Sequence, residues 1–171
     1  MMALPSKLKN FNLFNDAKSY LGQVPELTLP KLGRVMEEYR AGGMNGPVKI
    51  DLGQAGIEAE VTLGGLVTQV FQQYASTRVD GMLLRFAGAY QEDTTSIVSA
   101  VEVVMRGRIE EIDSGNAKVG ENSDMKVKLT LSYYKLTIDG AEIIELDLTN
   151  MVERVNGIDM LADQRKAIGL S

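Results

Sequence analysis

The sequence predicts a mainly β protein, an antiparallel β-sandwich or barrel with one flanking α-helix and a short C-terminal helix. The first observation is that apolar and polar residues alternate in several short segments, which is typical of strands with one buried face. The second is that turn signals separate these segments, the strongest being Asp139-Gly140. The third is that helix signals are confined to two segments. Many short strands with turns between them favour a sandwich or barrel.

The clearest strands lie between residues 125 and 148, on either side of Asp139-Gly140, which predicts a hairpin with a type I′ turn. The expected pairs are Ile138 with Ala141, Leu136 with Ile143, Tyr134 with Glu145, and Ser132 with Asp147. Both strands change their apolar face at the same level, around 133–134 and 143–144. Two explanations remain open: a one-residue bulge in each strand, or a hairpin tip that buries its other face against a partner.

Four further segments are candidate strands. Residues 57–63 alternate strictly and predict a strand whose polar face holds Glu58, Glu60 and Thr62. Residues 97–112 are rich in Val and Ile and predict a long strand, or a strand pair broken near Gly107. Residues 27–29 and 82–86 are shorter candidates. Together with the hairpin, these segments supply the many short strands of the predicted class.

Two segments carry helix signals. In residues 66–74, apolar residues at i and i+4 form one stripe, composed of Leu66, Val67, Val70, Phe71 and Tyr74. Near the C-terminus, Asp159 is placed to cap the start of a short helix, and Gly169 is placed to end it.

Length and composition indicate a single domain over residues 1–171. Hydrophobic residues make up 44% and charged residues 24%, as in ordinary soluble globular proteins. The net charge of −5 argues against tight nucleic-acid binding by phosphate neutralisation. No signal peptide or membrane span is visible, so we expect a protein without a membrane anchor that is made and kept in the cytosol, or that is exported by a route needing no such signal.

The residue inventory points away from catalysis. The chain has no cysteine and no histidine, which removes thiolate chemistry, the commonest general base and the commonest zinc ligand. The glycine loop at 115–120 lacks the Gly-Lys-Ser/Thr ending of a phosphate-binding loop. The acidic cluster at 110–113 does not have the spacing of a calcium loop, and the pair Glu58 and Glu60 is best explained as the wet side of a strand. We therefore expect no enzyme activity and no catalytic, cofactor-binding or metal site.

The segment YRAGGMNGP at 39–47 packs three glycines and a proline into a short stretch. A phosphate cradle, a flexible lid and a piece of scaffolding are all compatible with it. From the residues alone, a mobile surface loop is the favoured interpretation.

Seven motifs, taken in order, resemble those of a known family. They are NLFND (12–16), TLPKL (28–32), YRAGGMNGP (39–47), VVMRGRIEEIDSG (103–115), SYYKLTIDG (132–140), VNGID (155–159) and IGL (168–170). The chain resembles the major tail tube protein of contractile-tailed phages, shared with R-type phage-tail bacteriocins. One departure is Ala17-Lys18, where the pattern has a glycine after Asp16. This departure puts in question a tight turn with positive φ at that point.

The resemblance implies a structural subunit of an inner tail tube. Six protomers would form a ring, and stacked rings would form the conduit for DNA ejection or membrane puncture. It implies self-assembly as the main partnership, with a tail sheath protein, a baseplate tube initiator, a tail terminator and a tape measure protein as further partners. DNA would be only passing cargo, and the virion tail would be assembled in the host cytoplasm. A tube protein of a type VI-like secretion or extracellular injection system is the alternative, and a monomeric small-molecule-binding barrel is a distant third.

The resemblance also implies where the copies meet. A long excursion over about 30–56 would reach an adjacent protomer as an extended interface loop. The expected interface residues are Tyr39, Arg40, Gly42, Gly43, Met44, Asn45, Gly46, Pro47, Tyr133, Tyr134, Leu136 and Ile138. The expected lumen-lining residues are Glu58, Glu60, Thr62, Glu145 and Asp147, with Lys126 and Lys128 offsetting part of their charge.

Overall fold

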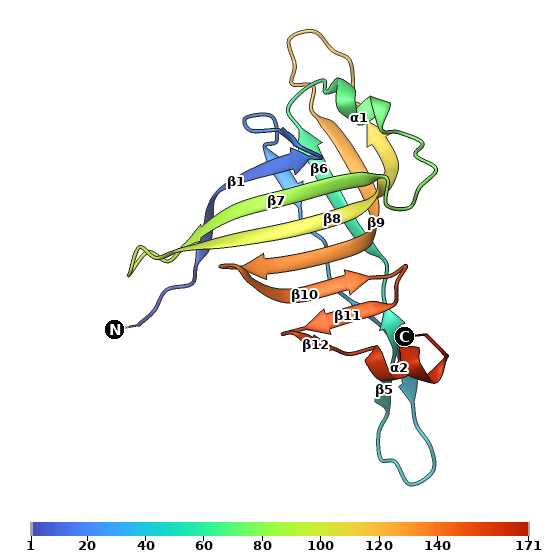
Figure 1. The fold of residues 1–171 in the computed structure, drawn as a ribbon. Helices are drawn as coiled ribbons and strands as arrows, with labels where there is room; N and C mark the ends of the chain where they lie inside the picture. Colours follow the sequence, from blue (N-terminus) through green and yellow to red (C-terminus); the bar gives the residue numbers. More distant parts are fainter. Residues whose placement is uncertain (1, 171) are drawn as a thin grey trace.

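One large antiparallel sheet makes up most of the computed structural model, which describes residues 2–170 (Figure 1). Its strand order is β12-β11-β10-β9-β8-β7-β1-β2, with β6 joined to β9 and β3 joined to β6. Strands account for 51% of the chain and helices for 7%. The predicted class, a mainly β antiparallel fold with two short helices, is confirmed.

The strands and helices have the following bounds: β1 (Lys7–Asn15), β2 (Lys18–Ser19), β3 (Glu26–Thr28), β4 (Arg34–Tyr39), β5 (Val48–Gln54), β6 (Ile57–Leu63), α1 (Thr68–Gln72), β7 (Met82–Gln91), β8 (Val98–Asp113), β9 (Met125–Ile138), β10 (Ala141–Asp147), β11 (Val152–Val155), β12 (Ile158–Asp159) and α2 (Ala162–Ala167).

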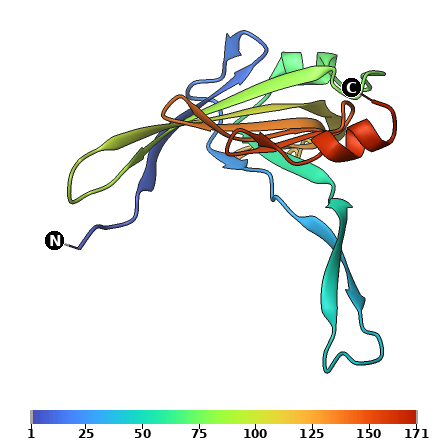
Figure 2. The same ribbon diagram turned by 60° about the horizontal axis from the view of Figure 1, so that its bottom comes forward.

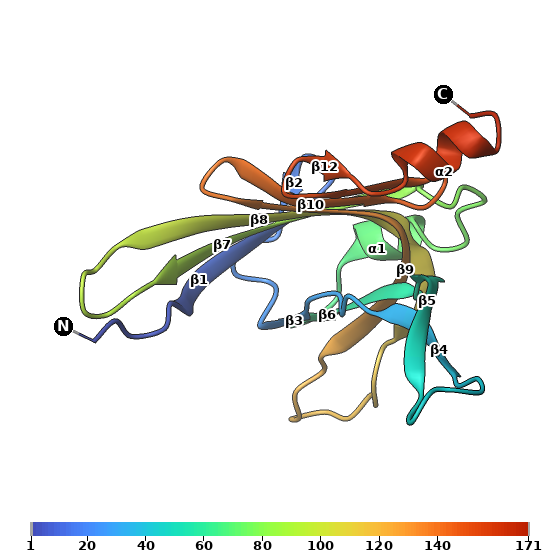
Figure 3. The same ribbon diagram turned by 90° about the horizontal axis from the view of Figure 1, so that it is seen from below.

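Strand β9 connects two layers. Its first half pairs with β6 and its second half with β10, while β8 lies along its other side. Figure 3 shows β9 curving from the layer that holds β10, β8, β7 and β1 to the layer that holds β6 and β3. Helix α1 closes one end of the space between the layers. The core therefore lies inside a single curled sheet.

Bulges explain why the apolar face changes sides in the β9–β10 hairpin. Ser132 is an extra residue in β9 against β8, and Ile143 is an extra residue in β10 against β9. Each bulge turns the following side chains over, so that Leu131 and Tyr134 both reach the core. Of the two explanations left open by the sequence, the structure shows the bulges.

The bulge at Ile143 also shifts the register of the hairpin. Ile138 pairs with Ala141 as predicted. The other three predicted pairs are wrong by one residue, because the structure pairs Leu136 with Ile144, Tyr134 with Leu146 and Tyr133 with Asp147.

Strand β8 runs unbroken through Gly107, so the long-strand interpretation is correct. A β-carbon at position 107 would lie 2.1 Å from the carbonyl oxygen of Thr130 and 2.9 Å from the α-carbon of Leu131. The register between β8 and β9 shifts at this same level. Glycine is thus the residue that lets the two strands cross closely while both of them bend.

Apolar side chains from β1, β6, β7, β8, β9 and β10 fill one core, together with Tyr20 and two residues near α1. Strand β6 has the predicted bounds, and its four apolar residues are all less than 5% exposed. The predicted stripe on α1 is only partly correct. Val67 and Val70 are buried, but Leu66, Phe71 and Tyr74 are exposed, because a helix of five residues turns only one side to the core.

A buried polar cluster attaches α1 to the end of β1. Asn15, which is 0% exposed, donates to the side-chain oxygen of Gln73 at 2.6 Å, and the Tyr20 hydroxyl donates to Gln69 at 2.7 Å. The β1–β2 turn next to it is tight, although no glycine follows Asp16. Asp16 itself adopts the left-handed conformation, with φ of 52°, as short polar residues can.

The C-terminal helix begins later than predicted, at Ala162, with Leu161 at its N-cap. Asp159 lies in β12, and its carboxylate accepts a hydrogen bond from the Leu161 amide at 3.1 Å. Gly169 ends the helix as predicted. Its φ is 84°, and the Leu170 amide donates to the carbonyl of Arg165 at 2.8 Å, as in a Schellman motif. No helix within residues 2–170 is long and apolar enough to cross a membrane.

Candidate assembly surfaces

Residues 34–54 form a β-hairpin that projects away from the body of the molecule (Figure 2). Strands β4 and β5 pair with each other in a separate two-stranded sheet. Every residue of β4 is exposed, and in β5 only Gly53 and Gln54 are partly covered. The sequence predicted an excursion over 30–56 as a loop; the structure has the excursion there, but as paired strands.

One face of this hairpin is mostly apolar, with Glu37, which pairs with Ile50, as its acidic residue. Tyr39 pairs with Val48, and strand alternation places Ile50, Leu52 and Val35 on the same side. These five residues, which we call the hairpin strip, are 44–58% exposed. A lone two-stranded hairpin is marginally stable in water, and contiguous exposed apolar residues mark interaction surfaces. The strip is therefore the strongest candidate contact surface in the molecule.

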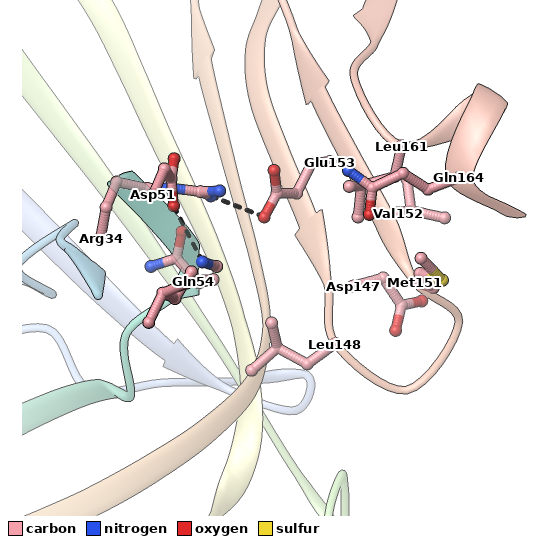
Figure 4. Close-up of a pocket in the computed structure, with 12 residues that line it drawn as sticks. Arg34, Asp51, Gln54, Asp147, Leu148, Met151, Val152, Glu153, Leu161 and Gln164 are labelled. Carbon is pink, nitrogen blue, oxygen red and sulfur yellow. Dashed lines mark hydrogen bonds and ion pairs between the residues drawn. The ribbon is translucent and has the colours of Figure 1, made fainter. Parts of the chain in front are cut away.

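An ionic cluster fixes the base of the hairpin (Figure 4). The Arg34 guanidinium donates to the Asp51 carboxylate at 2.8 Å within the hairpin, and to Glu153 of β11 at 2.7 Å. Glu153 is only 9% exposed. The hydrogen bond from Arg34 lowers the pKa of Asp51, and the carboxylates raise the pKa of Arg34. Because the pKa of Asp51 is lowered, its contribution to stability is present above the usual carboxyl range and is lost as pH falls.

A cleft of about 510 Å³ lies between the hairpin base and the β10–β11 turn. Arg34, Asp51 and Gln54 line one side, and Asp147, Leu148 and α2 residues line the other (Figure 4). Its charged groups are engaged with one another or with nearby backbone. Burial alone would raise the pKa of Asp147, but hydrogen bonds from Asn150 and Thr149 outweigh burial and lower it.

The glycine-rich tip closes through its own contacts. The Met44 amide donates to the carbonyl of Ala41 at 3.1 Å, and Arg40 donates to the carbonyl of Met44 at 3.2 Å. Gly43 has a φ of 88°, which favours glycine. A β-carbon at Gly42, Gly43 or Gly46 would meet nothing within 4 Å. Within one subunit, no other part of the chain comes close to these glycines.

The predicted interface residues of the β9–β10 hairpin are less available than those of the β4–β5 hairpin. Tyr134 is 5% exposed and belongs to the core, so its assignment to an interface is wrong. The bulge at Ser132 turns it inward. Leu136 and Ile138 are half-buried, and Leu136 packs against the core. The Tyr133 hydroxyl donates to Glu145 at 2.8 Å, and burial, with this hydrogen bond, raises the pKa of Tyr133.

The predicted lumen residues fall into two groups. Glu58 and Glu60 lie on the face of β6 that points away from the core, beside Lys126 and Lys128 of β9. Thr62 follows them on this face by alternation, but it is only 6% exposed, so the structure leaves little of it to line a lumen. Lys128 lies 3.7 Å from the Glu58 carboxylate. Strand β8 adds Glu111 opposite Lys128 and Asp113 opposite Lys126. This face therefore carries both signs of charge.

The second group has structural partners of its own. Glu145 accepts hydrogen bonds from Tyr133 at 2.8 Å and from Arg154 at 2.7 Å. The carboxylate of Asp147 accepts from Thr149 and Asn150 and closes the β10–β11 turn. These two residues lie in β10, which pairs with the second half of β9, whereas β6 pairs with the first half. The structure does not bring the five candidates together as one surface.

Among residues 2–170, no group of three or more acidic side chains is placed to hold a metal ion. What these surfaces offer to another molecule is therefore their shape, their apolar area and their charge. They match no arrangement of nucleophile, base and orienting group.

Comparison with known proteins gives this surface chemistry a context. The family model for phage tail tube protein FII matches residues 5–169. The chain belongs to this family. The resemblance inferred from the seven motifs is thereby confirmed.

Two curated relatives match over nearly their whole length. The tail tube protein of Escherichia phage P2 is 48% identical over 99% of this chain and 100% of the relative. The major tail tube protein of Serratia phage KSP20 is 40% identical over 99% of this chain and 99% of the relative.

Solved structures share the fold at much lower identity. The sheath/tube terminator of the extracellular contractile injection system PVC has a TM-score of 0.60 at 9% identity, covering 78% of this chain and 97% of its own. The anti-feeding prophage cap has a TM-score of 0.59 at 12% identity, covering 81% of this chain and 93% of its own. At such identities the likeness establishes the architecture alone.

Removing the Arg34 charge tests whether the ionic cluster holds the hairpin in place. Arg34→Met leaves the Glu153 carboxylate without its ion-pair partner, and because Glu153 is only 9% exposed, water replaces that partner only in part. We therefore expect the free energy of unfolding to fall by about 1–2 kcal/mol. Amide exchange in β4 and β5 should become faster. Urea unfolding and hydrogen exchange of the purified protein measure the two effects. Arg40→Met, which removes a charge at the tip, is the control, and equal results for both variants would contradict the anchoring role.

Proposed function

We propose that this chain forms rings of six copies, which stack into the inner tube of a contractile phage tail. As a member of the phage tail tube family, it is a structural tube subunit, and the proposal concerns how its copies assemble. The supporting observation is the hairpin strip, an apolar surface on a projecting element that the rest of the chain leaves uncovered. Burying such a surface against another copy is the simplest way to stabilise it.

Contacts that join different surfaces of identical copies suit a tube. A heterologous contact closes into a ring when its rotation allows closure, and it propagates as a stack when it does not. The hairpin and the body surface that receives it would form one such contact. Tyr39 at the strip and Arg40 at the tip are residue types that are enriched at interfaces. The interface residues at 39–47 are therefore proposed as tube contacts.

The face of β6 and β9 is proposed to line the lumen. Its acids outnumber its bases when Glu26, Glu58, Glu60, Glu111 and Asp113 are set against Arg108, Lys126 and Lys128. The net charge of −5 for the chain has the same sign. An acidic wall repels a DNA backbone, so passing DNA would find no site that holds it. Glu145 and Asp147 remain proposed lumen residues, although each already has structural partners.

The remaining partners follow from the proposed tube. A sheath protein, a baseplate tube initiator, a tail terminator and a tape measure protein would contact it, and assembly would take place in the host cytoplasm. A tube of an extracellular injection system is the second candidate, favoured by the shared fold with the PVC and anti-feeding prophage proteins. The two phage relatives at 48% and 40% identity favour the phage tail.

Concentrated purified protein should assemble into rings or tubes, because burying the apolar hairpin strip against another copy lowers the free energy of the assembly. Light scattering combined with size-exclusion chromatography measures the mass, and negative-stain electron microscopy identifies six-fold rings and stacked tubes. Because growth can require nucleation, a baseplate seed is added in a parallel sample. Monomer at every concentration, with and without the seed, would contradict the proposal.

Reversing the charge on the proposed luminal face should slow DNA passage without preventing tube formation. The variant Glu58→Lys with Glu60→Lys is expected to leave tubes visible by electron microscopy but to reduce genome delivery at least several-fold, because a basic wall attracts phosphates. Infectivity of phage carrying the variant is the measurement. The control, Asp93→Lys with Glu142→Lys, makes the same charge change at two hairpin tips. Normal infectivity of the first variant would count against an acidic lumen.

A further inference from the structure

The end of the molecule around α1 presents a second uncovered apolar surface. Leu66 is 83% exposed, Leu21 72%, Tyr74 58% and Phe71 41%. We call these four residues the α1 patch. A surface helix normally turns polar residues outward; α1 exposes Phe71 as well as the polar Thr68 and Gln72. The patch therefore has no explanation within a single subunit.

The sequence around the patch has no charge. From residue 61 to residue 77 there is no Asp, Glu, Lys or Arg, although charged residues make up 24% of the chain. Charged residues are depleted and aromatic residues enriched at the centre of protein interfaces. Both features are present here, with Phe71 and Tyr74 as the aromatic residues.

The patch is a fixed surface. The side chains of Gln69 and Gln73 are held by hydrogen bonds to Tyr20 and Asn15 beneath the helix. The Gly64 amide donates to the carbonyl of Gln23 at 2.8 Å and so joins the two loops that carry Leu66 and Leu21. Between these loops lies a hollow of about 250 Å³. A preformed surface of this kind binds without first having to be ordered.

The α1 patch and the hairpin strip lie at opposite ends of the molecule. In Figure 1, α1 is at the top and the β4–β5 hairpin at the bottom, and Figure 2 also shows the hairpin pointing away from α1. The two surfaces cannot meet within one chain. Arg34 and Glu153 hold the base of the hairpin against the body, so the strip cannot fold back.

We infer that the hairpin strip of one subunit lies on the α1 patch of a subunit in the adjoining ring. This inference rests on the proposed tube and names the surface that receives the hairpin. The occupant is a second copy because both surfaces are mostly apolar and they face opposite ways on the same molecule. Charge is sparse on both, with none in residues 61–77 at the patch and Glu37 alone on the face of the strip. Such a head-to-tail contact joins different surfaces, so it can propagate along a stack instead of ending at a pair. It repeats from ring to ring and drives elongation.

Disulfide cross-linking tests the contact directly, because the chain has no cysteine of its own. Tyr39→Cys on one tagged copy is mixed with Leu66→Cys on a differently tagged copy, assembled at high concentration and oxidised. Two other partners for Tyr39→Cys are run in parallel: Met160→Cys on the exposed apolar surface near α2, and Glu142→Cys at the exposed end of the β9–β10 hairpin. Covalent dimers are measured by non-reducing electrophoresis.

We expect Leu66→Cys to give at least tenfold more mixed dimer than either parallel variant in fractions that contain tubes. Tubes in which Tyr39→Cys joins Met160→Cys, or joins none of the three, would overturn the inference while leaving the proposed tube intact. If the unmodified protein never assembles, the proposed tube fails and the inference fails with it.

A second variant separates stacking from ring formation. Leu66→Glu places a charge in the α1 patch at a side chain that is 83% exposed, and circular dichroism and thermal melting check that it folds. We expect single rings to accumulate and tubes to be shortened at least several-fold by electron microscopy. Ile168→Glu, at an apolar side chain that is 64% exposed near the C-terminus, is the matched control. Tubes of normal length with Leu66→Glu, or shortening by Ile168→Glu alone, would overturn the inference.

Discussion

The close crossing of β8 and β9 at Gly107 is the constraint on which the rest of the structure depends. No β-carbon fits there, because the carbonyl of Thr130 occupies its place. The bulge at Ser132 lies at the same level. On its N-terminal side β9 pairs with β6, and on its C-terminal side β9 pairs with β10. One sheet can therefore curl into two layers and enclose its own core. The body is complete without β4 and β5, which are left free to project.

A folded body with an uncovered hairpin is the arrangement that an assembling subunit needs. The core supplies stability independently of any partner, while the hairpin strip and the α1 patch leave apolar area for association. The Arg34–Glu153 pair sets the direction of the hairpin before contact is made, so binding loses less conformational entropy. Charged side chains on the outward faces of the strands, such as Glu58 and Glu111, remain exposed to solvent in the free subunit.

The sequence predicts the fold well where local pattern decides it. Strict alternation predicts β6 with its observed bounds, and Gly169 ends α2 as expected. Tyr134 is misplaced because the site of a bulge depends on packing against β8, which alternation does not encode. The α1 stripe is overestimated because periodicity does not reveal that the helix has only five residues. Val48, Ile50 and Leu52 do alternate with Lys49 and Asp51, a strand signal that the glycine-rich tip obscures. The pairing of Arg34 with Glu153, which are 119 positions apart, is beyond any local pattern.

The central claim is that the β4–β5 hairpin is an assembly element. Hydrogen–deuterium exchange of residues 34–54, compared between free subunits and assembled tubes, tests it most directly. In the free subunit both strands are exposed and paired only with each other, so their amides should exchange quickly. The account predicts that exchange across this segment slows by at least tenfold in tubes. Equal exchange in the two states would contradict the claim, since it would show that no copy covers the hairpin.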